Sequence, residues 1–414
     1  MYSRFSHRFH WRAASALAGV ITAALTAACD VPTTTPRATP SDARQVAAAA
    51  VAAPPVSLEW QGVARAQVAT NNMSALAASR LYAALSVAQA RAVAAVDADA
   101  GVQGVGAGNG YGAGGRALYE ARRGAVAGAS VRVLGWFSAA ASAALEQRLA
   151  EQGEAGPGGV HPEFTRGVAV GRAIGDAMVT RLTNDNFTRA WNSPVPSGAG
   201  IWTPSSLPPA GGTLGQATPW FLNNNSQFRP PPPPAYLSPA FNTDLAVVVT
   251  TTTNLTPPQL AIALGWAYGA NTMTPGGYWD GLAAQYVAAD GLDEARATEV
   301  FAIMNAAVYD ALIACFEAKY FYWTLRPHQA DPAVVRAFTV PNYPSYPSGH
   351  QALSASAARV LTHYFPARAA TIDALRAEAS ISRVYAGIHY PFDMSAARTL
   401  GEGVADFAIA KGLP

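Results

Sequence analysis

The chain has 414 residues, half of them hydrophobic and only 13% charged, with a formal net charge of +2. This length can bury a large core in one or two domains, and the alanine-rich composition favours helices over sheet. With a net charge this close to zero, the protein has no overall positive electrostatic field that would attract nucleic acid. We therefore expect no nucleic-acid partner, and any anion site must be local.

The first 29 residues are typical of a signal peptide. Three arginines precede an apolar run of small residues that ends at Ala28 and is too short for a membrane span. Residues 25–29 resemble a bacterial lipobox, with Thr26 where Leu is usual; ordinary cleavage near Ala28 is the alternative. Both predict export to the periplasm, envelope or medium, with membrane contact only through a lipid on Cys29.

Only two cysteines are present, Cys29 and Cys315, so no intramolecular disulfide is expected after processing. Cys315 lies in an apolar helical run, which predicts a small buried core residue. After the signal peptide, no segment approaches the ~20 uninterrupted apolar residues of a membrane span.

Residues 30–56 are rich in Thr, Pro and Ala and predict a disordered tether. Residues 57–190 predict an N-terminal helical region with helices at 58–98, 116–152 and 164–182. In the last of these, glycines 167, 171 and 175 recur every four residues. Such a stripe lets another helix approach closely, and we interpret it as packing.

Residues 191–240 differ from the rest, because they combine Pro, Trp, Asn and Gly and include Arg229 followed by five prolines. A coil of this length inside a compact domain is usually functional or disordered. The interspersed aromatic residues favour an ordered wrap over a helical core. A proline-rich motif that binds a partner is the alternative.

Residues 241–414 predict a helical core without strands. The expected helices are at 241–249, 257–272, 276–289, 292–325, 350–364, 367–386 and 394–411. The long apolar helix 292–325 is expected to be central, and Asp310, which interrupts it, to be a paired structural carboxylate.

Three short segments in this core carry side chains that suit an oxyanion. Lys319 and Arg326 are seven residues apart, which would place them on one helix face about 10 Å apart. Pro327 predicts that the helix ends at Arg326. Two terminal cations would also suit the helix dipole, so this pair alone indicates no site.

The second segment is Pro347-Ser348-Gly349-His350, directly before a predicted helix. Ser348 could cap that helix, and its hydroxyl and the Gly349 amide could both donate to an anion. His350 would lie beside the same anion, where it could transfer a proton. An ordinary helix cap with an uninvolved histidine is the structural alternative.

The third segment supplies Arg383, whose planar guanidinium suits oxyanion oxygens, and His389, whose imidazole could bond to phosphorus or vanadium. Asp393 could accept the other ring N–H of His389 and orient it. Pro391 lies between them, so the two need not share a helix. Alone, the pair could be only a structural hydrogen bond.

Together and in this order, the segments resemble the signature of the type 2 phosphatidic acid phosphatase and vanadium-dependent haloperoxidase superfamily. That signature reads Lys, six residues, Arg-Pro; then Pro-Ser-Gly-His; then Ser-Arg, five residues, His, three residues, Asp. All of its positions are matched at residues 319–393. Weaker likeness to secreted bacterial haloperoxidase-like members extends back to about residue 160.

The resemblance implies an all-α bundle of the acid phosphatase and vanadium haloperoxidase type, wrapped by the Pro/Trp-rich coil, with the anion between helices. Each residue that matches the signature is then expected to have the role of the corresponding residue in the family. His389 bonds to phosphorus or vanadium, Asp393 orients it and His350 is the general acid/base. The oxyanion-binding residues are Lys319, Arg326, Ser348, Gly349 and Arg383.

The same resemblance allows two chemistries. A vanadium haloperoxidase would hold vanadate as cofactor on His389 and use peroxide to oxidise halide. A periplasmic acid phosphatase would need no cofactor and would hydrolyse phosphate monoesters through a phosphohistidine. A non-catalytic envelope protein with a retained anion pocket is a third reading.

Three features favour the haloperoxidase reading. The sequence predicts none of the several membrane spans of the lipid phosphatases, and the chain is longer than a minimal soluble acid phosphatase. Its long Pro/Trp-rich wrap also resembles the haloperoxidase-like group. The family's halide-tuning position holds Phe in chloroperoxidases and His in bromoperoxidases. Here it is Tyr343, which matches neither and leaves the halide open.

Overall fold

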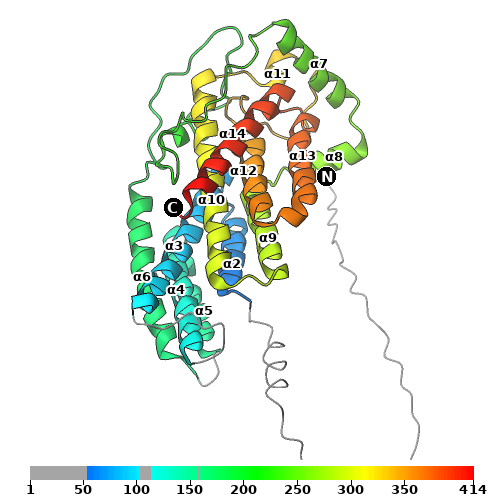
Figure 1. Ribbon diagram of the computed structural model, residues 1–414. Helices are drawn as coiled ribbons and strands as arrows, with labels where there is room; N and C mark the ends of the chain where they lie inside the picture. Colours follow the sequence, from blue (N-terminus) through cyan, green and yellow to red (C-terminus); the bar gives the residue numbers. More distant parts are fainter. Residues whose placement is uncertain (1–53, 103–112, 156–158) are drawn as a thin grey trace, which may run out of the picture. The chain divides into compact units, whose positions relative to one another are not determined.

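A computed structural model describes residues 54–102, 113–155 and 159–414 (Figure 1). These residues form one compact unit. Apart from loops they are helical, and the β pairing among them is a single bridge between Ile201 and Thr324, so the predicted all-α class is confirmed. Cys29, the signal peptide and nearly all of the tether lie outside the described residues, and the predicted boundaries at 190 and 240 stay predictions.

Two of the three helices expected in the N-terminal region contain breaks that the sequence patterns did not predict. The predicted helices 58–98 and 116–152 are each divided in two. Asn72 takes a left-handed φ of 48° in the first break, and Ser138 is extended, with φ −148°, in the second. The helices are α2 (Val56–Thr70), α3 (Ala75–Val102), α4 (Ala113–Phe137), α5 (Ser142–Glu154) and α6 (Pro162–Thr183).

The glycine stripe of α6 packs directly against α4. A Cβ atom at Gly167 would lie 2.0 Å from the carbonyl oxygen of Ala121, and one at Gly171 would lie 2.1 Å from that of Ala125. No side chain fits at these distances, so the two backbones can approach only because both positions are glycine. The packing interpretation of the stripe is therefore confirmed.

Gly171→Ala is expected to destabilise the fold by about 1–3 kcal/mol, because the new methyl group would push α6 away from the α4 backbone. The matched control is Gly62→Ala in α2, where the nearest atom to an added Cβ is Arg65 Nη2 at 3.7 Å. That change should leave stability unchanged or raise it by up to about 1 kcal/mol. Urea unfolding measures both; equal effects would contradict the close helix contact.

The remaining helices lie in the C-terminal part of the chain, from residue 239 onward. They are α7 (Pro239–Thr253), α8 (Pro257–Gly265), α9 (Thr274–Ala289), α10 (Glu294–Tyr322), α11 (Pro327–Ala330), α12 (Gly349–Tyr364), α13 (Ala369–Tyr385) and α14 (Pro391–Lys411). As predicted, α10 is central: it packs against α3, α12 and α14 (Figure 1). Cys315, on this helix, is fully buried, as expected.

Helix α10 is long and apolar enough, by length and composition alone, to cross a membrane, although polar residues such as Asp310 interrupt its apolar sequence. In the described unit, however, 94% of its most apolar window is buried inside the protein. Its hydrophobic surface is therefore covered by neighbouring helices, as in the core helix of a folded domain.

Two predicted helix ends were wrong. The helix expected to reach Arg326 stops at Tyr322, because Trp323 adopts a left-handed conformation with φ 51° and its N–H bonds back to the Lys319 carbonyl. Lys319 and Arg326 therefore do not share a helix face. Similarly, the helix expected at 257–272 ends at Gly265.

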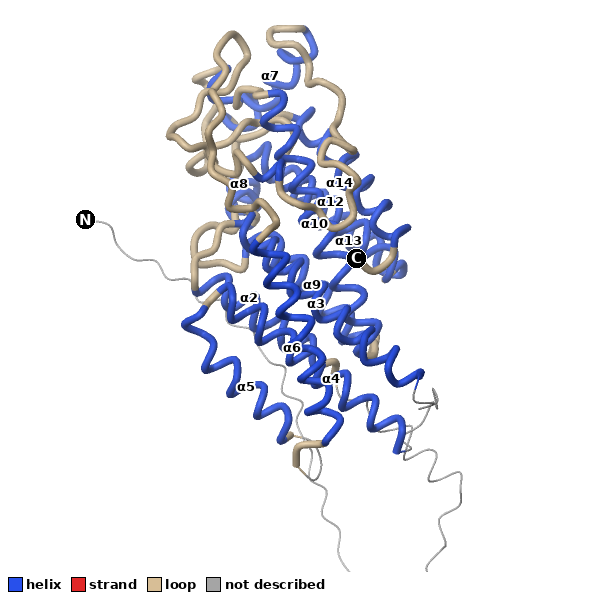
Figure 2. The backbone as a smooth tube through the Cα atoms, turned by 90° about the vertical axis from the view of Figure 1, so that its left-hand side faces the viewer, coloured by secondary structure: helices blue, strands red, loops and turns tan. Residues whose placement is uncertain are grey.

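The wrap at 191–240 is ordered, mostly non-helical chain, and Figure 2 shows such loops gathered at the end of the molecule that carries α7. Asp310 of α10 holds it in place. Its carboxylate accepts hydrogen bonds from the backbone N–H groups of Trp220, Phe221 and Leu222 at 2.8, 2.7 and 3.2 Å. Asp310 is thus a structural carboxylate as predicted, but its direct partners are backbone amides rather than a cation.

Candidate active site

The three sequence segments meet where several helix ends converge. Lys319 lies in the last turn of α10, and Arg383 in the last turn of α13. Ser348 caps the N-terminus of α12, and Asp393 lies in the first turn of α14. Arg326, the N-cap residue of α11, completes the group. All of these side chains are almost fully buried.

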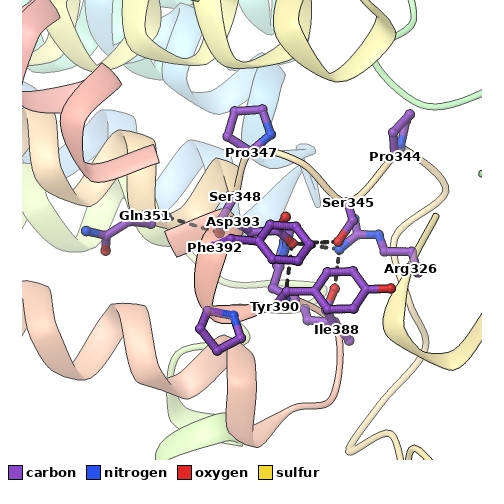
Figure 3. Close-up of polar contacts among 12 residues, drawn as sticks. Arg326, Pro344, Ser345, Pro347, Ser348, Gln351, Ile388, Tyr390, Phe392 and Asp393 are labelled. Carbon is purple, nitrogen blue, oxygen red and sulfur yellow. Dashed lines mark hydrogen bonds and ion pairs between the residues drawn. The ribbon is translucent and has the colours of Figure 1, made fainter. Parts of the chain in front are cut away.

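His389 is held in one orientation by Asp393. Its Nδ1 lies 2.7 Å from Asp393 Oδ2. The same oxygen accepts from Ser345 Oγ at 2.6 Å and from the Tyr390 amide at 3.1 Å (Figure 3). Since a carboxylate only accepts, His389 Nδ1 carries the proton and Nε2 keeps its lone pair. Nε2 lies 3.1 Å from Arg326 Nη1.

Three buried cations surround this imidazole, and carbonyl oxygens hold each of them. Lys319 donates to the carbonyls of Pro344 and Ser345, both at 2.8 Å. Arg326 donates to the carbonyls of Tyr343 at 3.0 Å and Ile388 at 2.6 Å. Arg383 donates to the carbonyl of Ala263 at 3.1 Å and to Ser382 Oγ at 2.9 Å.

No carboxylate of the described residues forms an ion pair with Lys319, Arg326 or Arg383. Burial lowers the pKa of Lys319 to about 7 and that of Arg383 to about 10. Burial, followed by the nearby cations, also lowers the pKa of His389 well below its usual range. Such a cluster of buried positive charge is stabilised only by a negative partner.

The residues present fit a tetrahedral oxyanion between His389 and the three cations. Arg326 Nη2 is buried and has no partner in the protein, so one donor remains free. A Cβ atom at Gly349 would meet nothing closer than Phe316 at 3.8 Å, so packing does not require glycine there, and its backbone is open to close approach. Among the described residues no group of three or more His, Cys, Asp or Glu side chains could hold a metal cation.

The Pro-Ser-Gly-His segment supplies further polar groups. Ser348 Oγ accepts from the Gln351 amide at 3.4 Å, which leaves its own hydroxyl proton free to donate. His350 Nε2 lies 3.1 Å from the carbonyl oxygen of Trp266 and must donate to it, so Nδ1 carries the lone pair. Burial and then Arg383 lower the pKa of His350, and the Trp266 carbonyl opposes this.

Tyr343 lies against two of the cations. Its ring centre is 5.0 Å from Lys319 Nζ, 5.1 Å from the Arg326 guanidinium carbon and 5.0 Å from the ring of Phe316. The structure therefore places this residue beside the site, where its size and electrostatics act on the anion-binding groups. Its role in tuning the pocket stays a prediction.

Sequence reasoning missed Ser345, which donates to Asp393 and whose carbonyl accepts from Lys319. The available signal was a repeat: Tyr-Pro-Ser occurs at 343–345 and again at 346–348, directly before Gly349. Only the second copy belongs to the signature, so the signature does not include Ser345. The carbonyls of Trp266 and Ala263 were missed because any residue type offers the same carbonyl group.

Residues 300–410 match the model of the PAP2 superfamily. This part of the chain belongs to that superfamily. No curated protein matches the chain significantly.

Several solved structures share the fold. One is the first bacterial vanadium-dependent iodoperoxidase, with a TM-score of 0.68 and 23% identity over 86% of this chain and 95% of that one. Others are a holo-type and an apo-type bacterial vanadium-dependent chloroperoxidase. Both are 15% identical and cover 81% of this chain; they have TM-scores of 0.62 and 0.65 and coverages of 91% and 93% of their own chains.

Anion binding at this site should take up a proton. Because the pKa of Lys319 is about 7 without an anion, a bound dianion raises it, and affinity should fall as pH rises above 7. Tungstate is a suitable probe, since it stays a tetrahedral dianion across the neutral range. Calorimetry in buffers of different ionisation enthalpy measures the proton uptake.

Lys319→Met should abolish the proton uptake and weaken tungstate binding by roughly tenfold to a hundredfold, the effect of losing a charged hydrogen bond. The control is Lys411→Met at the end of α14, where the ammonium contacts Phe221 and Asn223 instead. Unchanged proton uptake in Lys319→Met would contradict the assignment of Lys319 to the anion site.

Proposed function

We propose that this protein is an exported enzyme that binds vanadate and acts as a vanadium-dependent haloperoxidase. The observation that carries the proposal is the cluster of three buried cations without carboxylate partners around His389, whose Nε2 keeps its lone pair and lies 3.1 Å from Arg326 Nη1. The fold likeness to an iodoperoxidase and to chloroperoxidases, over more than four-fifths of the chain, supports the haloperoxidase branch.

The chain's own groups have distinct tasks in this proposal. His389 Nε2 would bond to the vanadium, and Asp393 keeps the ring oriented through its 2.7 Å hydrogen bond to Nδ1. Lys319, Arg326 and Arg383 would balance the charge of the vanadate oxygens. Bound vanadate would act as a Lewis acid that activates peroxide towards halide.

Ser348, Gly349 and His350 complete the site. The Ser348 hydroxyl and the Gly349 amide would donate to the remaining oxygens, as expected at the N-terminus of α12. His350, with its Nε2–H bonded to the Trp266 carbonyl, can accept and return a proton at Nδ1. Its lowered pKa keeps Nδ1 unprotonated at neutral pH, as a base requires.

A phosphatase is the second candidate, favoured by the match to the PAP2 superfamily. His389 Nε2 would attack a phosphate monoester, so that an N–P bond forms while the ester P–O bond breaks. The bound phosphate anion would favour protonation of His350 at Nδ1, and His350 would then give this proton to the leaving alkoxide. Water, deprotonated by His350, would then cleave the N–P bond and release phosphate.

The direct test is to load the purified protein with vanadate and to assay oxidation of a phenol dye with peroxide and chloride, bromide or iodide. We expect vanadate-dependent turnover with at least one halide, and loss of that turnover in His389→Ala. The control is His363→Ala, an exposed histidine of α12. All three halides are tested because Tyr343 matches neither the Phe of chloroperoxidases nor the His of bromoperoxidases at the halide-tuning position.

The same preparation separates the alternatives. If the vanadate-loaded protein oxidises no halide from acidic to neutral pH, the haloperoxidase proposal is wrong. Hydrolysis of p-nitrophenyl phosphate that vanadate inhibits would then establish the phosphatase. Anion binding without either turnover would establish a non-catalytic anion-binding protein.

Export is part of the proposal and rests on residues 1–29. The mass of the mature N-terminus from cells is expected to correspond either to a lipid-modified Cys29 or to a chain that starts near it. A mature protein that keeps Met1 would contradict export by this signal.

A further inference from the structure

Residues 229–234, an arginine followed by five prolines, form a segment that we call the proline strap. Proline fixes the backbone φ angle and lacks an N–H group, so a run of prolines is stiff. Its carbonyl oxygens have no donor within the run. Two tyrosines donate to two of these oxygens, those of Pro230 and Pro231.

One end of the strap is fixed to α10. Arg229 forms two hydrogen bonds to Glu317, and its guanidinium carbon lies 3.6 Å from the ring centre of Phe321. The Tyr322 hydroxyl donates to the Pro230 carbonyl at 2.7 Å. The strap is therefore anchored on the helix that carries Lys319.

The next carbonyl of the strap contacts the active-site loop. The Tyr346 hydroxyl donates to the Pro231 carbonyl oxygen, and the Tyr346 ring lies 5.5 Å from that of Tyr322 in an edge-to-face arrangement. Tyr346 is only 3% exposed, whereas Pro231 is exposed, so this hydrogen bond is partly buried. If it broke, the hydroxyl of the buried Tyr346 would lose the hydrogen bond that it makes to the protein.

Tyr346 belongs to the loop 343–349, whose other residues contact the catalytic groups. Ser345 donates to Asp393, and its carbonyl accepts from Lys319. The Ser348 amide donates to the backbone carbonyl of Asp393 at 3.2 Å. Within this loop, Tyr346 is the residue whose side chain bonds to the strap.

We propose that the proline strap braces the loop 343–349 through Tyr346, which makes Tyr346 a positioning residue for the oxyanion. The inference rests on the proposed oxyanion site and goes beyond it, because it assigns a role to a segment outside the signature. A stiff, separately anchored strap holds Ser345 and Ser348 at fixed distances from Asp393, as preorganised binding requires.

The test compares Tyr346→Phe with Tyr322→Phe. Each variant loses one hydroxyl that donates to a neighbouring proline carbonyl and keeps its ring, so the two are closely matched. Tungstate affinity should fall about fivefold in Tyr346→Phe, the effect of one neutral hydrogen bond, and by less than about twofold in Tyr322→Phe. Melting temperatures report any general loss of stability in both.

Amide hydrogen exchange in the protein without added anion tests the brace independently of the proposed function. Exchange in residues 343–349 should be faster in Tyr346→Phe than in the wild type. It should be unchanged in Tyr322→Phe, because Arg229 still anchors the strap to Glu317 of α10. Equal effects of the two variants on exchange or on affinity would overturn the positioning role. If the wild-type protein bound no tungstate, the proposed site would be wrong, whereas the exchange result would still decide whether the strap braces the loop.

Discussion

The site is organised by one electrostatic constraint: three buried cations lie together without a carboxylate to neutralise them. A buried charge is expensive unless it is paired, and the carbonyls around Lys319, Arg326 and Arg383 compensate only in part. The nearby carboxylate, Asp393, uses one oxygen on His389, Ser345 and Tyr390. A multiply charged oxyanion would neutralise the positive charge that remains.

The helical framework makes this cluster possible. The buried helix α10 delivers Lys319, and the left-handed residue Trp323 then redirects the chain so that Arg326 reaches the same place from a separate turn. The wrap is attached to this helix at Asp310 and at Glu317. The segments outside the signature therefore support the groups inside it.

Much of the site was predictable because its side chains are chemically distinctive and regularly spaced. Lys319, Arg383 and His389 were predicted from the signature, and the all-α class from composition and periodicity. The helix end at Trp323 was not, since nothing local requires a left-handed tryptophan. Ser345 and the Trp266 carbonyl were missed because their importance depends on which segments meet in three dimensions.

A crystal structure of the protein soaked with vanadate would test the central claim most directly. We predict vanadium bonded to His389 Nε2, with the vanadate oxygens in contact with Lys319, Arg326 and Arg383. Vanadate bound away from His389, or no vanadate at a concentration that saturates the protein in solution, would contradict the account.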